Sequence, residues 1–217
     1  MPVLDEAGQI EATLAALAPL RRRGVELIVV DGGSQDGTVA LARAEADAVL
    51  DAPRGRARQM NAGAAAARGE VLLFLHADTI LPTEADRHVL RAVAGGRDWG
   101  RFDVRIAGRH PMLRVVAMLM NWRSRLTGIA TGDQAIFVRR ELFQRIGGFP
   151  DQPLMEDIEL SRRLRRVSAP ACLPARATTS GRRWESRGVW RTIFLMWRLR
   201  WRYWRGESAH RLAAAYR

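Results

Sequence analysis

The sequence has a single cysteine, no lysine and no long apolar run. Because Cys172 stands alone, an intramolecular disulfide and a cluster of thiolate metal ligands are both excluded, as is usual in a reducing cytoplasm. No stretch approaches the roughly 20 apolar residues that span a bilayer, and no basic and apolar leader opens the chain. We therefore expect a cytoplasmic protein without classical export and without a membrane-spanning helix.

All 35 basic residues are arginines, a choice typical of a GC-rich bacterial genome, and they are placed unevenly. Residues 181–217 hold ten arginines against Glu185 and Glu207, which accounts for +8 of the net charge of +12. A chain of 217 residues, 47% of them hydrophobic, can bury one substantial core. We predict one domain over 1–180 and a basic extension, rich in Trp and Arg, over 181–217.

Segments with strand-like and helix-like apolar spacing alternate along the chain. Strands are expected at 2–4, 26–30, 71–75, 101–106 and 135–138, and helices at 38–46, 57–67, 85–94, 112–121 and 156–166, after a first helix that ends near Gly24. Such alternation builds a mostly parallel sheet with helices on both faces. The predicted fold class is α/β.

The turn from Asp31 to Thr38 (Asp-Gly-Gly-Ser-Gln-Asp-Gly-Thr) follows a buried strand. Its glycines permit close approach of the backbone to a ligand, and Asp31 can accept hydrogen bonds from a base or ribose. An ordinary turn in which Ser34 or Asp36 caps the next helix explains the same residues equally well. Because the turn is not a G-x-G-x-x-G fingerprint, a nicotinamide cofactor is disfavoured.

His76-Ala77-Asp78 follows the most apolar strand, at 71–75. A carboxylate at the end of a central strand can hold Mg²⁺ or Mn²⁺, and that ion can bridge two phosphates. The alternative is that Asp78 and Thr79 cap a turn ahead of Pro82, but the preceding strand favours the metal.

Glu156-Asp157 opens an arginine-rich helical segment. Carboxylates in a first helical turn are stabilised by the helix dipole, which is reason enough for their presence. The functional alternative is a general base, which must point into a cleft. The motif alone does not decide between them.

Several segments match, in order and approximate spacing, the motifs of one enzyme family. They are Pro2-Val3-Leu4-Asp5-Glu6, Asp31–Thr38, Arg54–Asn61, Leu75–Thr79, Thr131–Gln134, Gly147-Gly148-Phe149 and Glu156-Asp157. The sequence resembles the family 2 glycosyltransferases of the GT-A fold over residues 2–205. It is most similar to the bacterial subgroup of radical-SAM/selenodomain-associated transferases.

The resemblance implies transfer of one sugar, with inversion, from a nucleotide-diphosphate donor to an acceptor hydroxyl. Asp31 matches the aspartate that contacts the nucleotide base, and Asp78 matches the last aspartate of the Asp-x-Asp motif, which holds Mn²⁺ or Mg²⁺ and the diphosphate. Asp157 matches the catalytic base, with Glu156 beside it. The resemblance assigns further nucleotide-sugar contacts to Glu6, Gly33, Arg56, Gln59, Asn61 and His76. It assigns the acceptor and donor pocket to Gly132, Asp133, Gln134, Arg183 and Trp184.

Three features depart from the family pattern. His76 stands where relatives often have the first aspartate of Asp-x-Asp, and a structural role for it is favoured over metal coordination. Ser180 replaces the glutamine of the Gln-x-x-Arg-Trp motif of processive relatives, which favours transfer of a single sugar. Relatives carry several apolar residues before the proline that matches Pro2, so either the first strand is short or the true start lies upstream.

The segment Trp190–Arg205 has the pattern of an amphipathic helix. At about 100° per residue, its aromatic side chains share one face with Ile193, and arginines flank that face. The aromatic residues are Trp190, Phe194, Trp197, Trp201 and Trp204, and the arginines are Arg191, Arg198, Arg202 and Arg205. This pattern is typical of a helix lying in a membrane interface, although a face packed onto the domain is the alternative. We expect peripheral contact with the inner face of the membrane through 188–205, and an acceptor that is lipid-linked.

Two other functions compete with a glycosyltransferase. A nucleotidyltransferase can share the fold class, but its usual Gly-rich loop is absent after Leu4. A non-enzymatic binder of membranes or nucleic acid would use the basic tail. It leaves the acidic motifs unexplained, and these would repel a nucleic acid, which is therefore not an expected partner.

Overall fold

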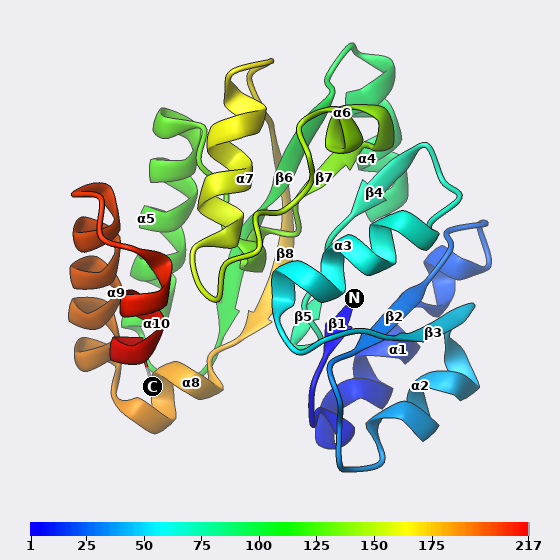
Figure 1. The fold of residues 1–217 in the computed structure, drawn as a ribbon, viewed down its shortest axis with the longest axis horizontal. Coiled ribbons are helices and arrows are strands. Elements are labelled where there is room, and N and C mark those ends of the chain that lie inside the picture. Colours follow the sequence, from blue (N-terminus) through cyan, green and yellow to red (C-terminus); the bar gives the residue numbers. More distant parts are fainter. Residues whose placement is uncertain (217) are drawn as a thin grey trace.

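The computed structural model describes residues 1–216 as two sheets with helices packed around them (Figure 1). The strands are β1 (Pro2–Val3), β2 (Ile28–Asp31), β3 (Ala48–Asp51), β4 (Val71–Leu73), β5 (Thr79–Ile80), β6 (Trp99–Ala107), β7 (Phe137–Arg139) and β8 (Ala171–Ser180). The helices are α1 (Ala7–Arg21), α2 (Thr38–Glu45), α3 (Arg56–Ala66), α4 (Ala85–Ala94), α5 (Met112–Thr127), the short 3₁₀ turn η1 (Gly132–Gln134), α6 (Arg140–Arg145), α7 (Glu156–Arg165), α8 (Arg182–Arg187), α9 (Val189–Trp204) and α10 (Ala209–Tyr216). The predicted α/β class, with a parallel sheet flanked by helices, is confirmed.

The N-terminal half contains a parallel sheet in the order β1-β2-β3. All four residues of β2 are buried, which explains the uninterrupted apolar run in this part of the sequence. Helix α3 packs on these strands, and Gly63 permits the close approach, since a Cβ atom there would lie 3.0 Å from Cγ2 of Val30. The packing presents Asp31 at the carboxyl end of the central strand.

The second sheet has the order β4-β7-β6-β8-β5 and mixes the two strand directions. β6 and β8 run parallel, whereas β7 is antiparallel to β4 and β6, and β5 is antiparallel to β8. The sequence does not predict β8, because Pro174 interrupts its pattern. The register opposite this proline shifts between Phe102 and Asp103, so Pro174 is accommodated at an irregularity of the ladder.

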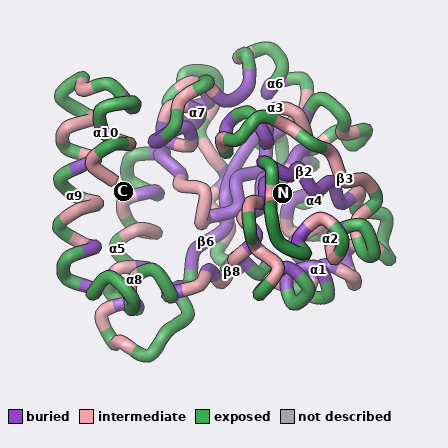
Figure 2. The backbone as a smooth tube through the Cα atoms, turned by 60° about the horizontal axis from the view of Figure 1, so that its bottom comes forward, coloured by how far each residue is buried: buried purple, intermediate pink, exposed green. Residues whose placement is uncertain are grey.

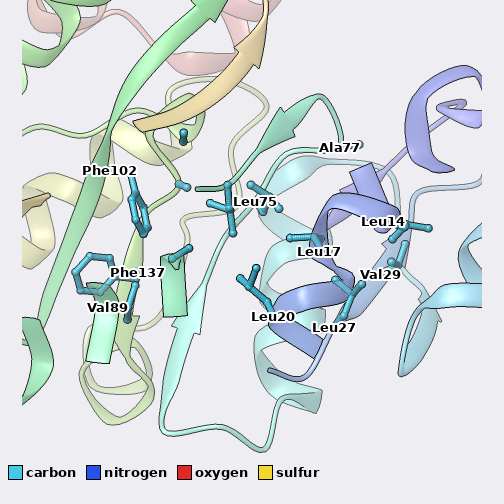
Figure 3. Close-up of a cluster of buried hydrophobic side chains, with 14 of the residues drawn as sticks. Leu14, Leu17, Leu20, Leu27, Val29, Leu75, Ala77, Val89, Phe102 and Phe137 are labelled. Carbon is cyan, nitrogen blue, oxygen red and sulfur yellow. The ribbon is translucent and has the colours of Figure 1, made fainter. Parts of the chain in front are cut away.

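Two apolar clusters hold the segment that follows β4. In the first, leucines of α1 pack with Leu27 and with Leu75 (Figure 3). In the second, the ring of Phe74 lies 4.8 Å from that of Phe149 and 5.1 Å from that of Phe143, centroid to centroid. Because Phe74 and Leu75 are anchored on opposite sides, the following residues His76 and Asp78 leave the core at a defined place.

A cavity of about 690 Å³ lies between β2 and β4. β1 has only two residues and pairs with β2, and within residues 1–216 no strand pairing joins the two sheets. The terminal ammonium of Met1 lies in the cavity and donates to the Ile28 carbonyl at 2.7 Å, and its burial lowers its pKa from 8.0 to about 5. Of the predicted site residues only Gln59 lines this cavity, so the candidate chemistry lies elsewhere.

The C-terminal helices pack against the preceding domain rather than standing apart from it. Leu199 of α9 and Leu212 of α10 are fully buried in a cluster with Ile129, Met155 and Ile158. The helix expected at 190–205 is confirmed as α9. No helix within residues 1–216 combines the length and apolar character needed to cross a membrane. The boundary between 180 and 181 stays a prediction.

Candidate active site

Asp31 is 4% exposed and organises its own turn. Its Oδ2 atom accepts hydrogen bonds from the backbone amides of Gly33 and Ser34, both at 2.9 Å, and its Oδ1 atom accepts one from the Ser34 hydroxyl. Burial acts to raise the pKa of Asp31, but these hydrogen bonds outweigh burial and hold the pKa below its ordinary value. The Asp31 carboxylate is therefore ionised and held in one position. A role in forming the turn is compatible with a role in binding a nucleotide.

The loop after β1 is fastened to the same turn. The Ser34 hydroxyl accepts from the Asp5 amide at 2.9 Å, and Asp5 Oδ1 accepts from the Gln35 amide at 2.8 Å. The Thr38 hydroxyl accepts from the Glu6 amide at 2.8 Å. Burial and, less strongly, the charge of Asp78 raise the pKa of Glu6, although a hydrogen bond from the Gln9 amide opposes this. The Thr13 hydroxyl donates to the Ala77 carbonyl at 2.6 Å, which fastens α1, the helix that follows Glu6, to the loop that carries Asp78.

Asp78 lies half-buried in the loop between β4 and β5. Its backbone carbonyl accepts from the Ser180 amide at 3.0 Å, and its Oδ1 atom accepts from the Thr79 hydroxyl at 3.3 Å. Within residues 1–216 the Asp78 carboxylate accepts a side-chain hydrogen bond only from Thr79. Most of its capacity to accept hydrogen bonds or to hold a cation is therefore available to a ligand.

The described residues fit a metal that is shared with a substrate. No group of three or more His, Cys, Asp or Glu side chains within residues 1–216 forms a complete protein cage. Mg²⁺ is commonly held by one or two carboxylates together with substrate phosphates. Asp78, with Glu6 nearby, matches that partial ligand set.

Glu156 and Asp157 open α7 but have different surroundings. Glu156 is 2% exposed, and its Oε1 atom lies 2.9 Å from Nε of Arg56. Its Oε2 atom has no hydrogen-bond partner within residues 1–216. Burial raises the pKa of Glu156 even though the charge of Arg56 opposes this. Asp157 is half-buried, and its Oδ2 atom accepts from the Gly132 amide at 2.8 Å.

The side chain of His76 lies against Gly132 and Asp133 of η1. Its Nδ1 atom is 3.7 Å from Oδ1 of Asp133. A Cβ atom on Gly132 would lie 2.3 Å from Cε1 of His76, so the imidazole requires a glycine there. A small cavity is lined by His76, Gly132, Glu156 and Asp157, together with apolar residues. The fold thus brings together residues more than 50 positions apart in the sequence.

The amides of Gln59 and Asn61 are occupied by the protein itself. The Gln59 Nε2 atom donates to the carbonyls of Val3 and Val30, both at 2.8 Å. The Asn61 amide donates to the Phe149 carbonyl at 2.9 Å and accepts from the Phe149 amide at 3.0 Å. These side chains position the strand ends and the Gly-Gly-Phe turn.

The remaining predicted pocket residues have mixed surroundings. Gln134 is fully buried, and it closes a capping box with Thr131. Arg183 donates to the Tyr216 hydroxyl and lies 5.3 Å from the centre of that ring. Trp184 packs with an apolar cluster of α5 and α9. Its ring is therefore used in packing, whatever its role toward an acceptor.

Arg123 is a residue that the sequence did not single out. Its two terminal nitrogens are buried without a hydrogen-bond partner within residues 1–216. Burial lowers the pKa of Arg123, and the negative charge of Asp157 opposes this shift. The signal available in the sequence was an arginine just after the apolar segment 112–121, where the same helix continues.

Replacing Glu156 by glutamine is expected to stabilise the protein at neutral pH. A carboxylate whose folded-state pKa is raised destabilises the fold when ionised, so its removal should add on the order of 1 kcal/mol. Arg56 loses this partner in the variant, but its side chain is 41% exposed and it keeps the negative charge of Asp157 nearby. The gain should disappear as pH falls below the ordinary pKa of 4.5, which thermal melts at pH 4 and pH 8 will show. A variant less stable than wild type at pH 8 would contradict the unfavourable burial of this charge.

Known proteins are similar to this chain in family and in fold. The model of the family described as "Glycosyl transferase family 2" matches residues 1–147. No curated protein matches the sequence. A solved structure of TarS from S. aureus is similar, with a TM-score of 0.66 and 17% identity over 83% of this chain and 59% of that chain.

Two further solved structures contain nucleotides and metals. A mannosyltransferase from Pyrobaculum calidifontis, in complex with GDP-Man and Mn²⁺, has a TM-score of 0.61 and 26% identity over 82% of this chain and 54% of that one. Glucosyl-3-phosphoglycerate synthase from Mycobacterium tuberculosis, in complex with Mg²⁺ and uridine diphosphate, has a TM-score of 0.60 and 22% identity over 82% and 68%. The chain spans a little over half the length of TarS and of the mannosyltransferase. Because the family model covers more than half of this chain, the chain belongs to glycosyl transferase family 2, a family of glycosyltransferase enzymes with the GT-A fold.

Proposed function

We propose that the protein transfers one sugar from a nucleotide-diphosphate donor to an acceptor hydroxyl, with inversion of the anomeric centre. The observation that carries the proposal is the small cavity that His76, two residues before Asp78, lines together with Glu156 and Asp157 at the start of α7. Asp31, at the carboxyl end of β2, is the third acidic position of the proposed site. We also propose that the protein belongs to the bacterial subgroup of radical-SAM/selenodomain-associated transferases, an assignment that the order of the motifs supports.

In the proposed site, Asp31 binds the base or ribose of the nucleotide, and Asp78 holds a divalent metal with the diphosphate. When bound, Mn²⁺ or Mg²⁺ would neutralise the charge that develops on the leaving diphosphate. Further contacts to the nucleotide sugar are proposed for Glu6, Gly33, Arg56 and His76, with Gln59 and Asn61 shaping the site through the backbone. The pocket for donor and acceptor is proposed to include Gly132, Asp133, Gln134, Arg183 and Trp184.

Asp157 is proposed as the base that removes the proton of the acceptor hydroxyl. A base must be reachable by the acceptor and must be able to accept a proton. Asp157 is half-buried at the small cavity, whereas Glu156 is almost fully buried and forms an ion pair with Arg56. In a single displacement the hydroxyl oxygen attacks the anomeric carbon while the bond to the diphosphate oxygen breaks, and the proton goes to Asp157.

The proposal is tested by incubating the protein with UDP-, GDP- and CDP-sugars, Mn²⁺ and a panel of acceptors. Release of a nucleoside diphosphate, together with a product of inverted anomeric configuration by NMR, supports it. A product with retained configuration would exclude the single displacement.

We further propose that α9 lies on the inner face of the membrane and that the acceptor is lipid-linked. The aromatic side chains Trp190, Phe194, Trp197, Trp201 and Trp204 are 55–77% exposed, so this face does not pack inward (Figure 2). Ile193, by contrast, packs toward α5. Of the flanking arginines, Arg202 is paired with Glu207, and Arg205 lies 4.9 Å from the centre of the Trp201 ring.

Replacing Trp197, Trp201 and Trp204 by serine is expected to release the protein from anionic vesicles. Ring burial and arginine contacts worth roughly 1 kcal/mol each should hold the wild type there, less firmly as salt rises. Co-sedimentation with anionic and zwitterionic vesicles measures this. Equal pelleting of the folded triple variant would refute a membrane role for the aromatic face.

A further inference from the structure

Helix α5 carries a second exposed apolar stripe. Its members are Val115 (37% exposed), Met118 (60%), Leu119 (47%), Trp122 (66%) and Leu126 (71%). At about 100° per residue these positions lie on one face, opposite the buried Leu113, Ala117 and Ser124. Scattered exposed apolar residues need no explanation, but a continuous stripe of five along one helix indicates a contact surface.

α5 and α9 lie side by side. Val189 and Ile193, near the start of α9, pack in one cluster with Leu113 and Ala117, near the start of α5. Leu199, further along α9, packs with Ile129, just beyond the end of α5. The two helices therefore run in the same direction, as Figures 1 and 2 also show. The buried residues of α9 pack toward α5 and toward α7, and the exposed stripes of α5 and α9 are both open to solvent.

The charge of this surface has one sign. Neither α5 nor α9 contains an aspartate or a glutamate. Exposed arginines border both stripes, among them Arg114 on α5 and Arg191 and Arg198 on α9, whereas Arg125 of α5 is paired with Asp103 of β6. A second copy of the chain docked here would bring arginines against arginines without carboxylates between them, which disfavours a dimer. Anionic phospholipid supplies both an apolar layer and the opposite charge.

The surface is built into the same packed unit as the acidic motif of α7. The buried side of α9 contacts Met155 and Ile158, which flank Glu156 and Asp157. Packed side chains, rather than a flexible linker, therefore connect α9 to the helix that carries the candidate base.

We propose that α5 and α9 together form one lipid-binding face, which lies flat on an anionic bilayer. The inference rests on the membrane contact proposed for α9 and adds α5 as a second half of the contact area. The face takes its apolar contact from both stripes and its electrostatic attraction from the arginines between and beside them.

The test separates the two helices. A triple variant of α5, with Met118, Trp122 and Leu126 replaced by serine, is compared with Leu90→Ser, which removes an equally exposed leucine from α4. The probes are phosphatidylglycerol/phosphatidylcholine vesicles and pure phosphatidylcholine vesicles. The α5 variant should lose roughly tenfold or more in affinity for the anionic vesicles, because three apolar side chains no longer enter the bilayer. Leu90→Ser should bind like wild type.

Folding and donor binding distinguish the possible failures. All substituted side chains are more than half exposed, so thermal melts and donor-nucleotide binding should match those of wild type. Wild-type affinity of the α5 variant for anionic vesicles would overturn the proposal, whether or not α9 binds. A wild-type dimer in sedimentation velocity that the α5 variant loses would also overturn it and identify a self-association face. Absence of donor binding with intact vesicle binding would refute the proposed enzyme instead, and not this face.

Discussion

Replacing Asp157 by asparagine is expected to leave donor binding intact and to slow sugar transfer by roughly 10²–10⁴-fold, the usual loss when a general base is removed. Asparagine keeps one oxygen that can accept from the Gly132 amide, which lies 2.8 Å from Oδ2 of Asp157, and loses the contact of Oδ1 with the adjacent Ile158 amide. Because the contact across to Gly132 is kept, the local fold should persist. What is lost is the ability to take up the acceptor proton. Initial rates at saturating donor, with nucleotide affinity measured separately, distinguish these effects.

Glu156→Gln is the matched control for Asp157→Asn. It changes the neighbouring carboxylate by the same chemistry, and it should reduce transfer less because Glu156 is buried against Arg56 rather than open to an acceptor. If Glu156→Gln is the more damaging variant, the base has been assigned to the wrong carboxylate.

Replacing Asp78 by alanine is expected to abolish metal-dependent nucleotide binding, a loss of more than about 100-fold in affinity. The loop should keep its shape, because it is held through the Asp78 carbonyl and the Ser180 amide rather than through the carboxylate. Titration of the variant with donor nucleotide, with and without Mn²⁺, measures the loss.

The control for Asp78→Ala is Asp98→Ala. It removes a surface carboxylate directly before β6, which lies 3.7 Å from Arg139 and is not among the candidate site residues. Asp98→Ala should bind as wild type does. Unchanged affinity in Asp78→Ala would refute its assignment as the metal ligand, whatever the outcome for Asp157.

Most elements of the fold were predictable because their sequence patterns are local. The helix at 85–94 has the predicted bounds. The strands β2 and β4 both lie in short apolar runs of the sequence, which is the pattern that predicted them. β8 was not predictable, since Pro174 is tolerated only through a shift of register against β6. α5 continues to Thr127, beyond the predicted end at Asn121. The prediction ended too early because the apolar residues of the last turns, Trp122 and Leu126, are exposed and do not continue the core-facing pattern. Gly128, with φ of 65°, ends the helix.

The candidate site was predictable where strand ends carry carboxylates, and less so where partners are distant in sequence. Asp31, Asp78 and Asp157 could be expected at one edge from the order of the elements. The partners of Gln59 and Asn61 lie up to 88 residues away, and the sequence does not reveal that their amides are occupied by backbone groups. The same holds for the burial of Arg123 near Asp157, which depends on how α5 packs.

The family match decides between functions that the sequence left open. A nucleotidyltransferase and a non-enzymatic binder both lose support, since the matched residues 1–147 include the turn at Asp31 and the loop at Asp78. The substrate class, by contrast, still rests on the geometry of the acidic residues.

The central claim is that these carboxylates bind a metal-complexed nucleotide sugar, and a thermal-shift screen tests it most directly. Wild type and Asp78→Ala are heated with UDP-, GDP- and CDP-sugars in the presence of Mn²⁺ or of EDTA. At least one donor should raise the melting temperature of wild type by several degrees with Mn²⁺, since ligand at 100 times its Kd stabilises by about 2.7 kcal/mol. EDTA and the substitution should each remove that increase. No shift with any donor, or an equal shift in the folded Asp78→Ala variant, would contradict the claim.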